Sequence, residues 1–593
     1  MKKYLPISIS LVALLIMAVA LLFFESDLLW KLQERNLFLN TSLFFDEQMV
    51  VPGGLLSWAG SWLTQFFYYP WLGTLLLCAC WLLLMWLVKK AFALTDQWMP
   101  LALIPVGLLL LTIVDMGYWI YFLKLPGYAF VGTLGTIAVA TLLWVFRCLP
   151  QRWGLRLLFI AVTAFVGYPL YPLLGIYGIA ATLLMGLYIW RFDQPLWQKV
   201  AGSLLALAGA ALVPLLCYHY AYHETNLSNI YYAALPLYFL QEEYHTYYLP
   251  YYGLALFFVL MVLLRPDGIK HFKCIAAQVL VLGALAWAVV NYWYKDENFH
   301  HELRMQRCIE QNDWEGVVTE AGLQKDEPTR AIVMMRNLAL SRLGRQGDEM
   351  FLYPNGSKRY EAPFGMRLMM CVGPMIYYHY GMINYSARLS TEMGVEFGWR
   401  AENLKLLAKC AILNKEEGRT RKFLNLLKHT TFYGNWVDEA RELDELKPVA
   451  RMMHYTNFLS GDNGYVERFL MNRLVESNSK DDALFQEQAL LATLWTKDIT
   501  QFWHHFRNYL DLHPKARIPR YIQEAAYLYG KLEDREMIDR MPIDQSVKQS
   551  FDNFMNAAQH YNHMEADYVR EGMKGFNDTY YYDYYLMRDL PEY

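Results

Sequence analysis

Charged residues are scarce in the first half of this chain and common in the second. The first 295 of the 593 residues carry 16 Lys and Arg and 12 Asp and Glu, whereas the whole chain carries 53 and 56. The formal net charge is −3 and no basic face emerges to meet phosphates, which excludes nucleic acid as a partner. A first half so poor in charge also excludes a soluble enzyme and predicts a membrane domain over residues 1–295.

Nucleotide-binding and hydrolase motifs are also missing. The sequence has no GxxxxGK[ST], no strand-framed GxGxxG, no HExxH and no GxSxG. An ATP-driven transporter and a soluble-type hydrolase therefore have no support. The eight cysteines include no CxxC pair, and five of them lie in or beside apolar runs. We expect them to be small buried apolar residues rather than zinc ligands or disulfides.

Apolar runs of about 20 residues recur through residues 1–295, which is typical of helices that cross a bilayer. They predict an all-α, polytopic transmembrane bundle of about nine spans. The segment 155–190 is interrupted at Tyr168-Pro169 and is either two spans or one kinked or re-entrant helix. The first run is followed by no small-residue cleavage site and is expected to remain as an anchor. The nine expected spans are 4–24, 69–88, 99–121, 127–147, 155–169, 173–190, 200–221, 249–264 and 272–294.

The distribution of Lys and Arg between the loops predicts the orientation. With the N-terminus in the cytoplasm, twelve Lys and Arg lie on cytoplasmic segments and three on the short outer loops. This positive-inside bias sends residues 296–593 outside, which in a bacterium means an inner-membrane protein with a periplasmic domain. Two outer loops are long, 25–68 and 219–248. The first is expected to hold helices at the membrane boundary, with a turn at Pro52-Gly53-Gly54.

Residues 296–593 contain amphipathic helices separated by short polar turns. The clearest pair is divided by Asn312-Asp313, and residues 483–514 form another. Such pairs resemble tetratricopeptide-type hairpins and predict a soluble α-solenoid, whose concave surface would bind a periplasmic protein or a glycan. The tyrosine-rich tail, residues 577–593, either caps the last helix or docks on the membrane half.

Four acidic residues of the first outer loop are candidates for chemistry. Glu25 and Asp27 come directly after the first span, and Asp46 and Glu47 lie in an otherwise apolar and aromatic stretch. A carboxylate at the end of a span can act as a general base toward an acceptor hydroxyl, or hold a divalent metal such as Mg²⁺ or Mn²⁺, while the lipid tail of a substrate stays in the bilayer. The alternatives are a polar helix end for the first pair and a solvated turn for the second.

A second candidate site lies at the end of the span 200–221. If the helix continues, His219 and His223 are four residues apart on one face, and they can chelate a metal together with Glu224. The alternative is a pair of interfacial histidines beside tyrosines. Asp115 is the one clear carboxylate within a span; it either faces a cavity or reaches the interface, and it alone would support a proton-coupled transporter.

The first loop and the next span carry a resemblance. The sequence from Asn36-Leu37-Phe38 through Pro52-Gly53-Gly54-Leu55-Leu56 to Thr64-Gln65-Phe66-Phe67-Tyr68-Tyr69-Pro70-Trp71-Leu72-Gly73 resembles uncharacterised Bacteroidota membrane proteins that pair many spans with a C-terminal helical-repeat domain. That resemblance covers the whole chain and implies no activity.

More remotely, the layout is similar to the GT-C glycosyltransferases, which have a long first outer loop and acidic residues after span one. This similarity implies transfer of a sugar from a polyprenyl-phosphate donor to an acceptor outside the membrane, often with a divalent metal. It makes Asp27 the first-loop carboxylate, with Glu25 next and Asp46 or Glu47 as a second acidic position. Glu25-Ser26-Asp27 departs from the adjacent acidic pair that is usual in that family.

Two functions are consistent with these observations. The first is a GT-C-like transferase that uses a lipid-linked sugar at the periplasmic face. Asp27 would be its general base or metal ligand, His219 and His223 would support a metal or pyrophosphate, and the solenoid would hold the acceptor. The second is a non-enzymatic inner-membrane scaffold whose periplasmic solenoid recruits partners for envelope assembly or secretion.

Overall fold

The computed structural model describes residues 5–150, 154–165, 170–223, 225–236, 247–264, 271–356, 367–458, 466–514, 516–535, 538, 540–561 and 564–590. Throughout these ranges every regular element is a helix, which confirms the predicted all-α class. The chain divides into two compact units. Unit 1 is Met1–Lys295 with Gly394–Glu402 and Asn425–Val437, and unit 2 is Asp296–Met393 with Asn403–Leu424 and Asp438–Tyr593.

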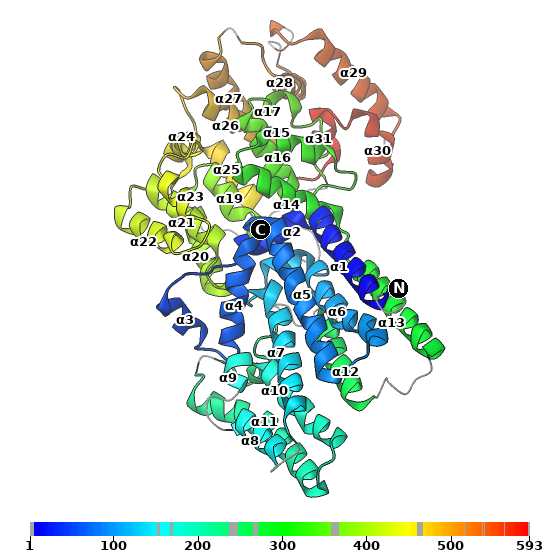
Figure 1. The fold of residues 1–593 in the computed structure, drawn as a ribbon. Coiled ribbons are helices and arrows are strands. Elements are labelled where there is room, and N and C mark those ends of the chain that lie inside the picture. Colours follow the sequence, from blue (N-terminus) through cyan, green and yellow to red (C-terminus); the bar gives the residue numbers. More distant parts are fainter. Residues whose placement is uncertain are drawn as a thin grey trace. The chain divides into compact units, whose positions relative to one another are not determined.

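Unit 1 is a bundle of helices in which α5 packs along α7, α7 packs against α4 and α10, and α11 packs between α10 and α8 (Figure 1). Its elements are α1 (Leu5–Phe24), α2 (Ser26–Glu34), α3 (Ser42–Gln48), α4 (Gly54–Thr64), η1 (Gln65–Tyr68), α5 (Pro70–Phe92), η2 (Asp96–Ala102), α6 (Leu103–Val114), η3 (Gly117–Tyr121), α7 (Tyr128–Cys148), α8 (Leu155–Phe165), α9 (Leu170–Leu174), α10 (Ile176–Tyr188), η4 (Ile189–Arg191), α11 (Leu196–Tyr220), η5 (Ile230–Tyr232), α12 (Leu249–Leu263) and α13 (His271–Tyr292).

Fewer helices qualify as membrane spans than the nine predicted. Five in the described part of the chain are long and apolar enough, and a sixth is counted only if α13 is joined with the helix that follows it. The apolar helices α8, α10 with η4, and α12 have 10–17 residues. At 1.5 Å per residue such helices are roughly 15–26 Å long, which is short of a ~30 Å hydrocarbon core. The five spans are Pro6–Phe24, Pro70–Phe92, Asp96–Val114, Tyr128–Cys148 and Leu196–Tyr220.

Local sequence explains where several of these helices begin and end. Pro70 occupies the first turn of α5, where a missing N–H costs no hydrogen bond, and the last turn carries Lys89 and Lys90. The expected turn before α4 is present: Gly53 adopts φ 82°, and a Cβ there would lie 2.6 Å from the Cβ of Ala234. Only glycine fits this position without strain. The interruption predicted at Tyr168-Pro169 lies outside the described residues.

Unit 2 is built from helices that pack against their neighbours in the chain, such as α14 with α15, α15 with α16, α25 with α26, and α26 with α27. Its elements are α14 (Glu297–Glu310), α15 (Trp314–Gly322), α16 (Arg330–Arg342), α17 (Gln346–Glu349), α18 (Arg367–Cys371), α19 (Gly373–His379), α24 (Leu446–Thr456), α25 (Val466–Glu476), α26 (Ala483–Thr496), α27 (Ile499–Leu512), α28 (Arg520–Leu532), α29 (Gln545–Gln559), α30 (Ala566–Gly572), η9 (Lys574–Phe576) and α31 (Tyr580–Leu586). Four helices contribute residues to both units: α20 (Ile383–Phe397), α21 (Ala401–Leu413), α22 (Glu417–Lys428) and α23 (Gly434–Glu439).

Aspartates set the starts of the predicted helical pairs. Asp313 ends the turn after α14 and its side chain accepts a hydrogen bond from the N–H of Gly316, while Asp482 and Asp498 cap α26 and α27 in the same way. Both predicted pairs, around Asn312-Asp313 and within 483–514, are therefore confirmed. A regular repeat that would make unit 2 a tetratricopeptide-like solenoid stays a prediction.

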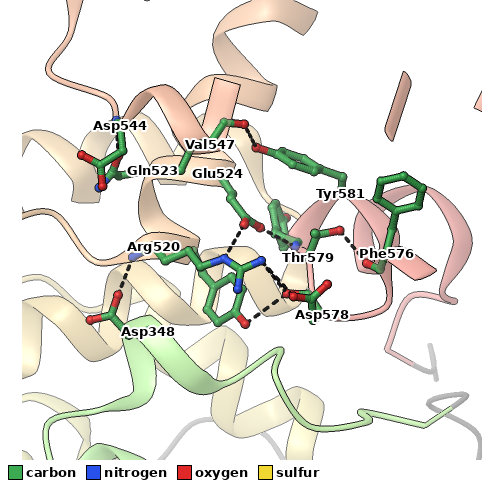
Figure 2. A network of polar contacts seen from close by, with 12 residues as sticks. Asp348, Arg520, Gln523, Glu524, Asp544, Val547, Phe576, Asp578, Thr579 and Tyr581 are labelled. Atoms are coloured by element: carbon green, nitrogen blue, oxygen red, sulfur yellow. Dashed lines mark hydrogen bonds and ion pairs between the residues drawn. The ribbon is translucent and has the colours of Figure 1, made fainter. Parts of the chain in front are cut away.

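The tyrosine-rich tail packs inside unit 2. Tyr580 and Tyr581 are fully buried, and the N–H of Tyr580 donates to Oε2 of Glu524 at 2.7 Å. Figure 2 shows Arg520 between Glu524 and Asp578, with Nε 2.8 Å from the Glu524 carboxylate and Nη2 3.1 Å from that of Asp578. The tail thus caps the helices of its own unit, which is one of the two expected outcomes.

Candidate functional site

Glu25 and Asp27 lie where the first span ends. Glu25 is the residue between α1 and α2, it is 1% exposed, and its Oε1 accepts a hydrogen bond from Nε1 of Trp293 at 2.5 Å. Burial raises the pKa of Glu25 to about 8, the hydrogen bond from Trp293 lowers it in part, and the charge of Asp27 raises it further. At neutral pH, a protonated and buried Glu25 therefore lies close to a half-buried Asp27.

Asp46 and Glu47 are exposed on α3, whose inner side is held by the buried Phe44. Thr41 begins this helix by accepting a hydrogen bond from the N–H of Phe44 at 3.2 Å. Both acidic side chains therefore lie on the exposed surface of this helix.

The helix that was expected to carry both His219 and His223 ends before His223. Helix α11 ends at Tyr220, so His223 lies outside it, and the expected shared helical face is wrong. His219 and His223 are both exposed. Glu224, the third predicted ligand, lies outside the described residues.

Among the predicted site residues that the structure describes, Glu25 and Asp27 lie close enough for the charge of Asp27 to act on Glu25. The main neighbours of α2 are η1, α5 and α1, whereas those of α11 are α10, α8, η4 and η5. Among the described residues, no three His, Cys, Asp or Glu side chains are placed to hold a metal ion. Because Glu224 lies outside that part of the chain, the divalent metal stays a prediction. Asp115 follows the last residue of α6, and burial raises its pKa to about 7.

A cluster of buried charges at the end of α2 was not predicted. Glu402, which belongs to the unit 1 segment Gly394–Glu402, accepts hydrogen bonds from Nζ of Lys31 and from Nη1 of Arg35, each at 2.6 Å. The side chains of Lys31 and Arg35 are 6% and 5% exposed. Burial raises the pKa of Glu402, but the charges of the two cations outweigh it and hold that pKa below its usual value.

Arg400 adds a third buried cation to this cluster. It is 3% exposed and donates to the backbone carbonyls of Tyr121 at 3.5 Å and Leu123 at 3.0 Å. Arg35 donates to the same Tyr121 carbonyl, so the two guanidinium groups converge on one oxygen. We call Lys31, Arg35, Arg400 and Glu402 the cation cluster.

A second segment of the later chain, Asn425–Val437, also packs in unit 1. Nε2 of Gln33 donates to the hydroxyl of Tyr433 at 2.5 Å, and that hydroxyl donates to the carboxylate of Glu34. The ring of Phe432 stacks on Tyr68 with centroids 5.2 Å apart. We call this segment and Gly394–Glu402 the returning segments. Polar residues of α2 hold both of them.

One sequence signal for the cation cluster existed. Lys31 and Arg35 are two of only three Lys and Arg expected on the short outer loops. A buried cation needs a counter-charge. The partner could not be predicted because Lys31 and Glu402 are 371 residues apart in the chain.

The chain matches the model of a family of unknown function, DUF6057, over residues 2–588, and it belongs to that family. No curated protein and no solved structure matches it. The Bacteroidota resemblance and the similarity to GT-C glycosyltransferases therefore stay predictions.

Proposed function

We propose that the protein is a non-enzymatic scaffold of the bacterial inner membrane, in which unit 1 is fixed in the bilayer and the periplasmic unit 2 binds a protein partner of envelope assembly or secretion. One observation carries the proposal. The first-loop helix α2 and the residue after it use Lys31, Gln33 and Arg35 to hold the returning segments of the same chain.

Because Lys31 and Arg35 are buried and paired with Glu402, a substrate has little access to their side chains. Lys31 and Arg35 are almost fully buried, and Glu402 is shared between them at 2.6 Å. A substrate would have to break a buried ion pair to reach them, which is costly. This arrangement suits a loop that joins distant parts of a chain.

The helical pairs of unit 2 supply the surface that a partner would bind. Large apolar side chains are exposed there at Phe458 (50%), Leu532 (45%) and Tyr568 (63%). Stacked helical pairs present extended surfaces that commonly bind proteins, and apolar and aromatic side chains are common anchors in such interfaces.

Site-specific photo-crosslinking in the whole chain tests the scaffold. A photoreactive residue is placed in turn at Phe458, Leu532 and Tyr568, and at Arg419, whose side chain is 70% exposed and serves as the control. The scaffold predicts one recurring protein adduct from the apolar positions, absent at Arg419 and unchanged by Asp27→Asn. If no apolar position yields a specific adduct, the scaffold role is wrong.

A GT-C-like transferase is the second candidate, and the pair of carboxyl groups at the end of α1 favours it. Asp27 would take the proton of an acceptor hydroxyl as that oxygen attacks the sugar carbon and the polyprenyl phosphate leaves. Glu25, protonated at neutral pH, would keep the neighbouring charge low.

The two candidates give different results with Asp27→Asn. Membranes carrying this variant at normal expression would lose sugar transfer from a polyprenyl-phosphate donor if the protein is a transferase. Glu25→Gln is the matched control, because the amide resembles the protonated acid and should keep the activity at pH 7. Unchanged glycan output from Asp27→Asn would end the transferase proposal.

A further inference from the structure

Arg35 and Arg400 line a small cavity in unit 1 that contains no carboxylate. The other polar lining residues are Asn36, Thr64 and Tyr128, and the rest of the lining is apolar, including Leu32 of α2, Leu123 and Ala129 of α7. Two guanidinium groups in one cavity repel each other unless an anion lies between them.

Both guanidinium groups have unused hydrogen-bond donors. Each guanidinium carries five N–H donors, and within the described residues Arg35 has acceptors at two of its nitrogens and Arg400 at two. Nε of Arg35 is buried and has no hydrogen-bond partner among the described residues. Buried donors of this kind are normally satisfied, so an acceptor is missing.

The charges of the cluster are also unbalanced. Lys31 and Arg35 share the single carboxylate of Glu402, whereas Arg400 donates to two backbone carbonyls and pairs with no acidic side chain in the described chain. Glu34, the adjacent acidic residue of α2, accepts instead from the hydroxyl of Tyr433. A buried arginine without a counter-ion is expensive, and an anion in the cavity would remove that cost.

The cavity lies at the ends of several spans on one side of the bundle. Its lining comes from the residues after Pro6–Phe24, from those between Asp96–Val114 and Tyr128–Cys148, and from Thr64 just before Pro70–Phe92. Lipid phosphates lie at this level of a membrane, where arginine binds them through paired donors.

We propose that Arg35 and Arg400 bind one phosphate group in this cavity, supplied by a lipid headgroup or by free phosphate. Because Arg400 belongs to a returning segment, the bound phosphate would tie that segment to α2. This site is independent of the scaffold role, since it requires only unit 1.

The test uses the full chain, purified in a phosphate-free neutral detergent. Inorganic phosphate is titrated while the melting temperature is recorded, with sodium chloride at equal ionic strength as the reference. In parallel, the chain is placed in nanodiscs of phosphatidylcholine alone or with phosphatidylglycerol. A saturable rise in melting temperature with inorganic phosphate shows that the free anion is sufficient. A rise in melting temperature only in nanodiscs with phosphatidylglycerol identifies the lipid.

Two variants show whether the response comes from this cavity. Arg400→Gln should raise the half-saturating concentration at least about tenfold, since one lost charge-assisted bond is worth about that factor. Arg441→Gln, at a 48% exposed arginine of unit 2, should leave it unchanged.

If Arg400→Gln does not fold, Ala129→Val tests the same site, because it narrows the cavity and keeps every charge. The proposal is overturned if neither phosphate nor phosphatidylglycerol raises the melting temperature more than sodium chloride does. It is also overturned if the folded variants Arg400→Gln and Ala129→Val show the same rise in melting temperature as the unmodified chain.

Discussion

Glu402→Gln should destabilise unit 1 by on the order of 3 kcal/mol. The substitution keeps the shape of the side chain but leaves Lys31 and Arg35, which are 6% and 5% exposed, without their shared counter-charge. Removing one partner of a buried pair typically costs about 3–5 kcal/mol, and the lower end applies because Glu402 is itself 22% exposed.

A matched control lies in the same segment. Glu396 pairs with Lys124 at 2.5 Å, but these side chains are 49% and 35% exposed. Such surface pairs are worth about 0–1 kcal/mol, so Glu396→Gln should change little. The expected difference in the free energy of unfolding between Glu402→Gln and Glu396→Gln is about 2 kcal/mol. It corresponds to a melting temperature of Glu402→Gln that is lower by on the order of 4 °C.

The assay is thermal unfolding of the whole chain in detergent, combined with protease cleavage within Gly394–Glu402. Glu402→Gln should melt earlier and be cut faster than Glu396→Gln. Adding Lys31→Met should restore part of the loss, because a buried cation is removed together with its missing partner. Equal melting temperatures for the two glutamine variants would refute the buried cluster.

The pH dependence gives an independent check. The folded pKa of Glu402 is below its ordinary value of 4.5, so its stabilising contribution is present above 4.5 and is lost as the pH falls through the folded pKa. The unmodified chain should therefore lose more stability on acidification than Glu402→Gln. A glutamine variant with the same acid profile would show that the carboxylate is not paired in the folded state.

Three further predictions concern other buried groups. Gly127→Ala should destabilise unit 1 by several kcal/mol in thermal unfolding, because a Cβ would lie 2.2 Å from a backbone nitrogen and φ is +69°; a normal melting temperature would contradict the close approach. Glu25 has a folded pKa of about 8, so its contribution is fully present below pH 4.5 and is lost as the pH rises to about 8; Glu25→Gln should melt higher than the unmodified chain at pH 9, and an identical profile would count against it. Tyr580→Phe removes a buried hydroxyl that bonds two partners and should cost about 1–3 kcal/mol by denaturant unfolding, unlike Tyr585→Phe at a 42% exposed position.

Local features of the fold could be predicted from the sequence. The turn at Asn312-Asp313 and the turn before α4 depend on residues within a few positions of one another, and both are present. The number of spans was overestimated because hydropathy counts apolar residues without regard to where a helix ends. Helix α12, for example, ends at Leu263 and has only 15 residues.

The contacts of the candidate site could not be predicted from the sequence. Acidic residues beside a span are chemically suggestive, but burial decides their role, and burial depends on distant segments. Glu25 is covered by Trp293, 268 residues away, and Lys31 meets Glu402 only after the chain returns to unit 1. Neither contact leaves a periodic pattern in the sequence.

The buried cations at the end of α2 have a physical reason to join distant segments of the chain. Burying a cation is unfavourable unless a partner compensates it, so each buried cation of the cluster makes unit 1 dependent on the segment that carries its partner. Glu402 meets this need for Lys31 and Arg35, while Arg400 brings a further positive charge with it. The segment Gly394–Glu402 thus supplies the carboxylate of Glu402 to Lys31 and Arg35, and it needs a second anion for Arg400. That remaining charge is why a phosphate at the end of the spans would complete the attachment, and why attachment should strengthen in a membrane that contains anionic lipid.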